Sequence, residues 1–144
     1  MPLPVGVEQR TETDLGALSI VSLNVDALSM SKAQLLSGWF DTYDLVLLQE
    51  VGKDPTATVL QTCLPHHIAY TVNPARTAGV KGKGMLIAVK QDLHHIFSYH
   101  GCDVQPDCPY VQWCTLQLLD SALQIGNVYV PCSQAANRLH LTAD

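Results

Sequence analysis

The sequence predicts a mixed α/β fold, in which a mixed β-sheet is backed by helices. Its first 51 residues have a strand–helix–strand pattern, and residues 43–51 form a near-continuous apolar run typical of a strand buried on both faces. From residue 85 onward the chain has a series of strand-like segments that ends in a hairpin. A strand–helix–strand unit followed by hairpins is typical of a mixed sheet with helices packed against it.

The first strand and helix follow from periodicity. Apolar and polar residues alternate over residues 17–25, as in a strand. Residues 28–40 predict a helix, for which Ser29 or Ser31 is a suitable N-cap. Its expected apolar stripe consists of Leu35, Leu36, Trp39 and Phe40.

A second helix and a third strand are expected after the apolar run at residues 43–51. Residues 54–64 begin with Asp54 and Pro55, which is a favourable helix start because proline suits the first helical position. Residues 66–72 are rich in β-branched and aromatic side chains and predict a short strand.

Four strand-like segments follow a glycine-rich loop at residues 73–84. They cover residues 85–90, 94–100, 110–119 and 122–130. The tight link at residues 119–122 indicates a hairpin between the last two. Residues 131–144 predict a helix that starts near Ser133, and residues 1–16 form a polar lead-in.

Composition favours one folded domain. The chain has 144 residues, of which 47% are hydrophobic and 15% are charged, so it has enough apolar side chains for a core. A net charge of −5 argues against a general nucleic-acid-binding surface, which needs an excess of basic residues. It does not exclude an enzyme that acts on a phosphodiester through a metal ion.

The sequence has neither a membrane-spanning apolar stretch nor a recognisable secretory signal. We therefore expect no membrane span and favour an intracellular protein. Reduced thiols are expected for the five cysteines, Cys63, Cys102, Cys108, Cys114 and Cys132. Their spacing does not fit a structural zinc site, so small buried side chains are the preferred interpretation.

Polar residues follow the first two predicted strands. A right-handed crossover makes these strands parallel, so that their carboxyl ends meet at one edge of the sheet. That edge carries Asn24 and Asp26 from one strand, and Gln49 and Glu50 from the next. Asn24 and Asp26 would point the same way, about 7 Å apart, if the strand continued through both.

This arrangement predicts a divalent metal site. Neighbouring strands lie about 5 Å apart, so Glu50 and Asp26 would share one cation. Two carboxylates and an amide oxygen suit Mg²⁺ or Mn²⁺. The alternative is that these residues are polar only because the strands emerge into water.

Four motifs resemble those of the endonuclease/exonuclease/phosphatase superfamily. They are SLNVDAL (22–28), YDLVLLQEV (43–51), GKGMLIAVK (82–90) and LQIGNVYVP (123–131), in the order in which the family has them. Members include repair and retrotransposon endonucleases, deadenylases, sphingomyelinases and inositol-polyphosphate phosphatases. The matched residues extend over most of the chain.

The resemblance implies roles for five residues. Glu50 would be the principal metal ligand and Asp26 a secondary one, with Mg²⁺ or Mn²⁺ as the cofactor. Asn24 would order the active site, and Tyr129 would face the substrate phosphate. Gln49 would contact the substrate backbone. Without the family pattern, a packing role would be preferred for Tyr129.

Two family motifs are missing. The sequence has no Gly-Asp-x-Asn motif and no Ser-Asp-His motif, and Cys132 stands where repair endonucleases have Asn. The family fold has four layers, with two sheets packed face to face between helices. The resemblance therefore implies that residues 17–144 are the N-terminal half of such a domain, truncated at the C-terminus. We expect one sheet face to be exposed until the missing half or a partner chain covers it.

The leading functional hypothesis is Mg²⁺-dependent, nuclease-like phosphodiester hydrolysis by the complete domain. The 144-residue chain would have little activity alone, because the two missing motifs support the attacking water and complete the site. Nucleic acid is the first choice of substrate, and lipid or inositol phosphates remain open. The alternative is a non-catalytic interaction domain that retains the fold.

Overall fold

The computed structural model describes residues 8–10, 17–52, 55–73, 84–103 and 110–130. The predicted helix near Ser133 and most of the polar lead-in lie outside these residues. The strands are β1 (Ile20–Asn24), β2 (Leu45–Gln49), β3 (His67–Val72), β4 (Met85–Lys90), β5 (Phe97–Asp103), β6 (Tyr110–Gln117) and β7 (Ala122–Tyr129). The helices are α1 (Met30–Leu36) and α2 (Ala57–Cys63), with 3₁₀ helices η2 (Trp39–Thr42) and η3 (Gln91–Ile96).

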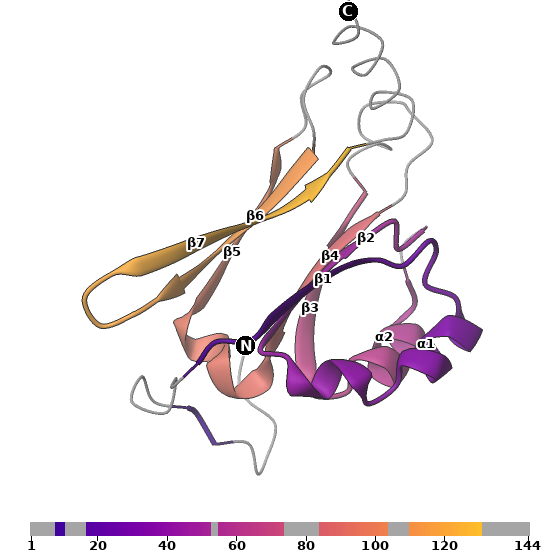
Figure 1. Cartoon of the computed structure of the whole chain (residues 1–144), viewed down its shortest axis with the longest axis horizontal. Coiled ribbons are helices and arrows are strands. Elements are labelled where there is room, and N and C mark those ends of the chain that lie inside the picture. The colour runs from indigo at the N-terminus through magenta and orange to yellow at the C-terminus, as the bar shows by residue number, and fades with distance from the viewer. Residues whose placement is uncertain (1–7, 11–16, 53–54, 74–83, 104–109, 131–144) are drawn as a thin grey trace, which may run out of the picture.

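These elements form three layers (Figure 1). Helices α1 and α2 lie on one face of a mixed sheet with the strand order β1-β2-β4-β3. In this sheet β1 and β2 are parallel, as predicted, and the other pairs are antiparallel. The mixed α/β fold class is confirmed. Besides the predicted mixed sheet, the structure has a second, antiparallel sheet formed by β5, β6 and β7.

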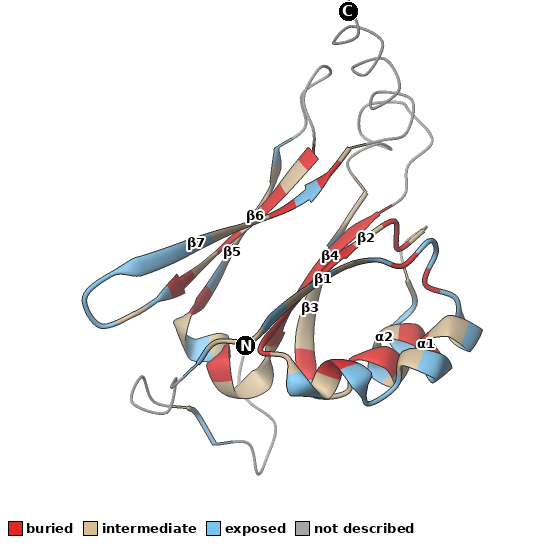
Figure 2. Ribbon diagram, in the orientation of Figure 1, coloured by how far each residue is buried: buried red, intermediate tan, exposed pale blue. Residues whose placement is uncertain are grey.

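The two central strands bury both faces, which explains their uninterrupted apolar sequence. Both strands are coloured as buried over most of their length (Figure 2). Their side chains alternate between two separate cores. Those facing the helices are Val46, Leu48, Leu86 and Ala88. Those facing the second sheet are Leu45, Leu47, Ile87 and Val89.

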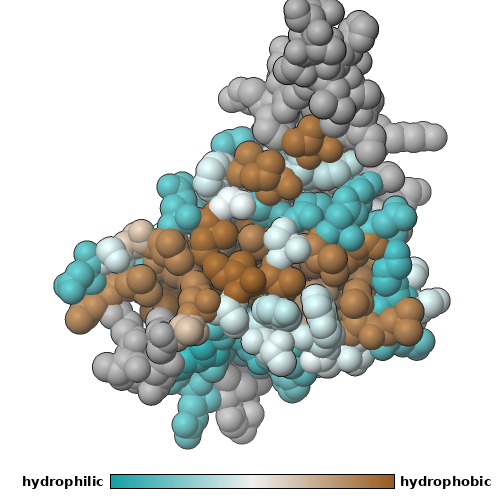
Figure 3. Space-filling view, viewed as in Figure 1, coloured by the Kyte–Doolittle hydropathy of each residue, from teal (hydrophilic) through white to brown (hydrophobic). Residues whose placement is uncertain are grey.

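The expected uncovered face of the first sheet is covered by the same chain. Phe97, Cys114 and Leu116 of the second sheet pack on it, together with Leu93 of η3. This 3₁₀ helix follows β4 directly and leads the chain into the second sheet, which the sequence pattern did not indicate. Apolar side chains are instead exposed on the side of the molecule where the edge strands β1 and β7 lie (Figure 3), and Ile20 there is 41% exposed.

Helix and strand ends differ from the predictions in several places. Helix α1 is capped by Ser29, one of the two predicted residues, but it ends at Leu36. Leu35, which was expected in the apolar stripe of this helix, is 83% exposed and lies outside the core. Thr56 caps α2 by accepting a hydrogen bond from Val59 N at 3.2 Å, and the predicted start residue Asp54 lies outside the described residues. No helix in the described ranges has the length and apolarity that crossing a membrane requires.

The predicted strand at 94–100 starts three residues later than expected. His94, His95 and Ile96 belong to η3, and β5 begins at Phe97. The β5–β6 register shifts between Tyr99 and Gly101, which is the signature of a β-bulge.

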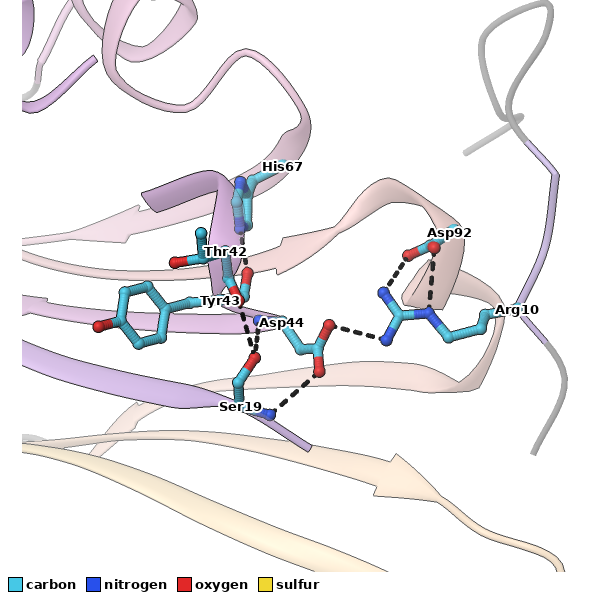
Figure 4. Close-up of polar contacts among 7 residues, drawn as sticks. All are labelled: Arg10, Ser19, Thr42, Tyr43, Asp44, His67 and Asp92. Atoms are coloured by element: carbon cyan, nitrogen blue, oxygen red, sulfur yellow. Dashed lines mark hydrogen bonds and ion pairs between the residues drawn. The ribbon is translucent and has the colours of Figure 1, made fainter. Parts of the chain in front are cut away.

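Asp44 aligns the starts of β1 and β2 (Figure 4). Its Oδ2 accepts a hydrogen bond from Ser19 N, and Ser19 Oγ accepts one from Asp44 N, both at 3.0 Å. Its Oδ1 forms a 2.8 Å ion pair with Arg10, which also binds Asp92 through two hydrogen bonds. The amino ends of the parallel strands are therefore held by charge-assisted bonds.

His67 is a buried titratable group at the start of β3. Its Nε2 donates a 2.8 Å hydrogen bond to Tyr43 O (Figure 4), and its Nδ1 has no partner among the described residues. Burial lowers the pKa of His67 below the ordinary value of 6.5, because it disfavours the charged imidazolium.

Replacing Asp44 tests its role in strand alignment. We expect Asp44→Asn to lower the free energy of unfolding by about 2 kcal/mol, because a buried carboxylate that accepts from Ser19 N and Arg10 is lost. Asp92→Asn is the matched control, and we expect at most about 1 kcal/mol since the Asp92 side chain is 31% exposed. Urea denaturation measures both, and equal losses would contradict the proposed role of Asp44.

The lowered pKa of His67 predicts a pH-dependent stability. As the pH falls through 6.5, the unfolded chain protonates at this position while the folded chain does not, so the free energy of unfolding decreases. His67→Gln retains a donor for Tyr43 O and should remove this contribution, whose slope is at most about 1.4 kcal/mol per pH unit. His66→Gln, at the exposed neighbour, should leave the slope unchanged. Urea denaturation between pH 5 and 8 tests both, and an unaltered slope in His67→Gln would contradict the assignment.

Candidate functional site

The carboxyl ends of β1 and β2 meet at one edge of the first sheet. We call this edge, formed by residues 24–27 and 49–52, the rim. Backbone bonds continue the parallel pairing beyond the strands, from Val25 N to Gln49 O at 3.1 Å and from Ala27 N to Glu50 O at 2.6 Å. The predicted residues Asn24, Gln49 and Glu50 are therefore brought together at one edge.

The rim backbone is locally unusual. Asp26, Ala27 and Glu50 have positive φ angles of 47°, 69° and 57°. Non-glycine residues adopt this conformation rarely, and such residues cluster at functional sites. The structure corrects one assumption about Asp26. Because β1 ends at Asn24 and the chain then turns, Asp26 does not lie on a continuation of the strand.

Asn24 joins the two halves of the rim. Its Nδ2 donates a short hydrogen bond to Glu50 Oε2, and its Oδ1 accepts one from Asp26 N at 3.1 Å. Glu50 is only 9% exposed, so this bond helps to orient a largely buried carboxylate. Asn24 therefore fixes both the Asp26 turn and the Glu50 side chain.

Lys32, which the sequence analysis did not select, also holds the rim. From the first turn of α1, its ammonium group donates to Val25 O at 2.6 Å and to Asp26 O at 2.7 Å. These two bonds stabilise the left-handed turn at Asp26 and Ala27. A basic residue in the first turn of the helix that follows β1 was the available signal.

Gln49 bonds across to the second sheet. Its Nε2 donates to Asn127 Oδ1 at 2.7 Å, with further contacts to Ser22 Oγ at 3.0 Å and Leu47 O at 3.3 Å. Substrate contact by Gln49 stays a prediction. In this structure its amide nitrogen is engaged between the two sheets.

Tyr129 is the last residue of β7 and is 7% exposed. Its ring packs with Tyr110, at a centroid distance of 6.4 Å, and belongs to the same cluster as Met85. Because Met85 is paired with Gln49 in the β2–β4 register, Tyr129 lies toward the rim end of the first sheet. A packing contribution is therefore evident, and a role toward a phosphate stays a prediction.

Gly84 explains the glycine-rich entry to β4. Its N donates to Gly52 O at 3.1 Å, and its O accepts from Val51 N at 2.9 Å. A Cβ at this position would lie 2.9 Å from Gly52 O and 3.1 Å from Val72 O. Only glycine permits this close approach of two backbones, which fixes residues 51 and 52 of the rim.

The rim has oxygen ligands of the kind that Mg²⁺ and Mn²⁺ prefer. Glu50 and Asp26 are the rim residues with carboxylate side chains, and Asn24 bonds to the Glu50 carboxylate and to the backbone N of Asp26. Across the residues that the structure describes, no group of three or more His, Cys, Asp or Glu side chains is arranged to hold a metal ion. The residue types of the rim are therefore suitable for a divalent ion, and metal binding by Glu50 and Asp26 stays a prediction.

The described cysteines are poor metal ligands. Cys63 and Cys114 are buried in different cores, and burial raises their pKa to about 11. Burial, together with neighbouring Asp103, also raises the pKa of Cys102 to about 11. Thiols that stay protonated near neutral pH agree with the interpretation of small buried side chains.

Comparison with known proteins shows a similarity of fold. No protein-family model matches the sequence, and no curated protein matches it. Two crystal structures of TDP2 from Caenorhabditis elegans, one of them the selenomethionine protein, are similar at TM-scores of 0.57 and 0.56 and 15% sequence identity.

The alignments cover 87% and 88% of this chain but only 40% of each TDP2 chain. This chain therefore has a fold similar to part of TDP2, in agreement with the expected partial fold.

Replacing Lys32 tests its contribution to the rim. We expect Lys32→Met to lower the free energy of unfolding by about 1 kcal/mol, because two hydrogen bonds from a partly exposed ammonium group are lost. Amide exchange at Ala27 and Leu28, measured by NMR, should also become faster. Gln34→Met, on the exposed side of the same helix, is the control. Unchanged exchange in Lys32→Met would show that the turn does not depend on this side chain.

Proposed function

We propose that this chain contributes the metal-binding rim of a Mg²⁺-dependent phosphodiesterase of the endonuclease/exonuclease/phosphatase superfamily. The observation that carries the proposal is the bond between Asn24 and Glu50 at the shared edge of two parallel strands. It occurs in a chain whose fold resembles part of TDP2, and it joins the two residues that the first two family motifs select.

In this proposal, Glu50 is the principal ligand of Mg²⁺ or Mn²⁺ and Asp26 a secondary one. When bound, such an ion polarises a phosphoryl oxygen and stabilises the charge that develops on it. Asn24 holds the Glu50 carboxylate in place, and Tyr129 orients the phosphate. Gln49 contacts the substrate backbone. A water molecule attacks the phosphorus in line with the leaving oxygen.

Complete activity is proposed to need more than these 144 residues. The sequence lacks the Gly-Asp-x-Asn and Ser-Asp-His motifs that support the water and complete the site in the family. We therefore propose that residues 17–144 act as the N-terminal half of a domain and turn over little substrate alone. The remaining part of a longer chain, or a partner chain, would supply the missing groups.

Nucleic acid is the proposed substrate. The Asp26 and Tyr129 positions follow the repair-endonuclease pattern of the superfamily that the sequence motifs resemble, and the fold resembles part of TDP2. The net charge of −5 keeps lipid and inositol phosphates as alternatives.

The second candidate is a non-catalytic interaction domain. It is favoured by one observation, namely that no cluster of three metal-ligating side chains occurs in the described part of the chain. The two candidates differ in whether the rim binds a divalent ion.

Mn²⁺ binding to the 144-residue chain tests the proposal. Mn²⁺ is titrated into the protein, and the free ion is measured by electron paramagnetic resonance. We expect Glu50→Gln to raise the Kd for Mn²⁺ at least about tenfold, because the principal carboxylate ligand is lost. Asp120→Asn, at an exposed carboxylate in the β6–β7 turn, should leave the Kd unchanged. In a longer chain that carries the missing motifs, Glu50→Gln should also abolish Mg²⁺-dependent cleavage of a labelled oligonucleotide.

Absence of Mn²⁺ binding by the unsubstituted chain would favour the interaction domain. Equal Mn²⁺ affinity in Glu50→Gln would show that the metal assignment is wrong.

A further inference from the structure

Three side-chain amides form a continuous line between the two sheets, starting at the rim. Gln49 Nε2 donates to Asn127 Oδ1 at 2.7 Å, and Asn127 Nδ2 donates to Gln112 Oε1 at 3.1 Å. Asn127 lies on β7 and Gln112 on β6, opposite each other in the strand register. Both are almost completely buried, although the inner faces of the two sheets are otherwise mainly apolar.

The orientation of the Asn127 amide follows from its surroundings. Its Nδ2 also donates to Leu48 O at 2.9 Å and to Leu86 O at 3.1 Å. A reversed amide would place Oδ1 against these two carbonyl oxygens, which cannot donate. Leu48 and Leu86 are opposite each other in β2 and β4, so one side chain of the second sheet bonds both central strands of the first.

The far end of the line is anchored as well. Gln112 Nε2 donates to Tyr70 O on β3 and to Tyr99 Oη on β5, both at 3.0 Å. A buried amide is unfavourable unless its donors and acceptors are bonded, and this line satisfies them mutually. It therefore selects one placement of the second sheet over the first, whereas an apolar interface alone would tolerate sliding.

This placement bears directly on the rim. Among the described residues, Asn127 is the hydrogen-bond partner of the Gln49 side chain in the second sheet, and Gln49 immediately precedes Glu50. Tyr129 lies two residues beyond Asn127 on the same face of β7, so both side chains move with that strand. A shift of β7 by two residues along the strand direction would move Tyr129 by about 7 Å.

We propose that Asn127 is a positioning residue for the rim, which acts through Gln49 to hold the Glu50 carboxylate and through β7 to hold Tyr129. The inference rests on the proposed function for the roles of Glu50 and Tyr129. The dependence of the rim geometry on Asn127 does not need that function. Asn127 does not face the rim directly, so its effect should be indirect and should depend on Gln49.

The test combines metal affinity, stability and a metal-free signal. Asn127→Leu keeps a similar volume and removes the hydrogen bonds. We expect it to raise the Kd for Mn²⁺ about tenfold, as substitutions behind a metal ligand commonly do. Gln49→Leu should raise the Kd for Mn²⁺ by a similar factor. Because both residues act through the same bond, the double variant should have a Kd no higher than that of the single variant with the higher Kd.

Leu116→Ala is the matched control. Leu116 is buried between the same sheets but makes none of the amide bonds. It should lower stability in urea denaturation at least as much as Asn127→Leu does, while the Kd for Mn²⁺ stays within about twofold. If Asn127 has only a structural role, the Kd for Mn²⁺ should rise in both variants in proportion to their loss of unfolding free energy. That result would overturn the proposal.

A signal in the metal-free protein separates this inference from the proposed function. The side-chain NH₂ group of Asn24, which donates to Glu50, is observed by ¹⁵N NMR. Asn127→Leu should shift this resonance and accelerate its exchange with water, and Leu116→Ala should not. If the unsubstituted chain binds no Mn²⁺, the proposed function fails and this resonance alone decides the inference.

If Asn127→Leu does not fold, Gln49→Leu decides. It removes the bonds of Gln49 to Asn127, Ser22 and Leu47, but retains the buried bonds that Asn127 donates. An unchanged Asn24 resonance in Gln49→Leu would overturn the proposal.

Discussion

The parallel pairing of β1 with β2 is the constraint on which the candidate site depends. Asp44 and Ser19 align the strands at their amino ends, and the register then places Asn24 opposite Gln49 at the other end. Every contact between the two halves of the rim follows from this register. Because side chains alternate along a strand, a shift by one residue would remove Asn24 from Glu50 and reverse the buried and exposed faces of β1.

The two sheets are joined by contacts of two kinds. Apolar side chains such as Leu47, Ile87 and Leu116 supply the buried area, which is favourable for many relative placements of the sheets. The amides of Asn127 and Gln112 are directional and are satisfied in one placement. The rim is therefore a product of both sheets, although its carboxylates come from the first sheet alone.

Much of the candidate site could be anticipated from local patterns. A polar residue at the end of each parallel strand led to Asn24 and Glu50, and the structure brings these two together. The assumption that the strand continues through Asp26 is wrong, because β1 ends at Asn24 and Asp26 has a positive φ, whereas the role of Asp26 as a metal ligand stays a prediction. Lys32 and Asn127 were missed because their partners are backbone carbonyls and a side chain of another sheet, which no local pattern contains.

Periodicity and apolar runs were sufficient for the existence and order of the strands and for the parallel first pair, although not for the exact strand ends or for η3. The former depend on short-range preferences and on the handedness of the crossover. The division of the strands into two sheets was decided by the tertiary structure. Leu93 and Phe97 turn the chain over the face of the first sheet, and burial of that face stabilises the arrangement. The inter-sheet position of Asn127 likewise exists only once both sheets have packed, because hydrogen bonds between distant segments have no counterpart in the local sequence.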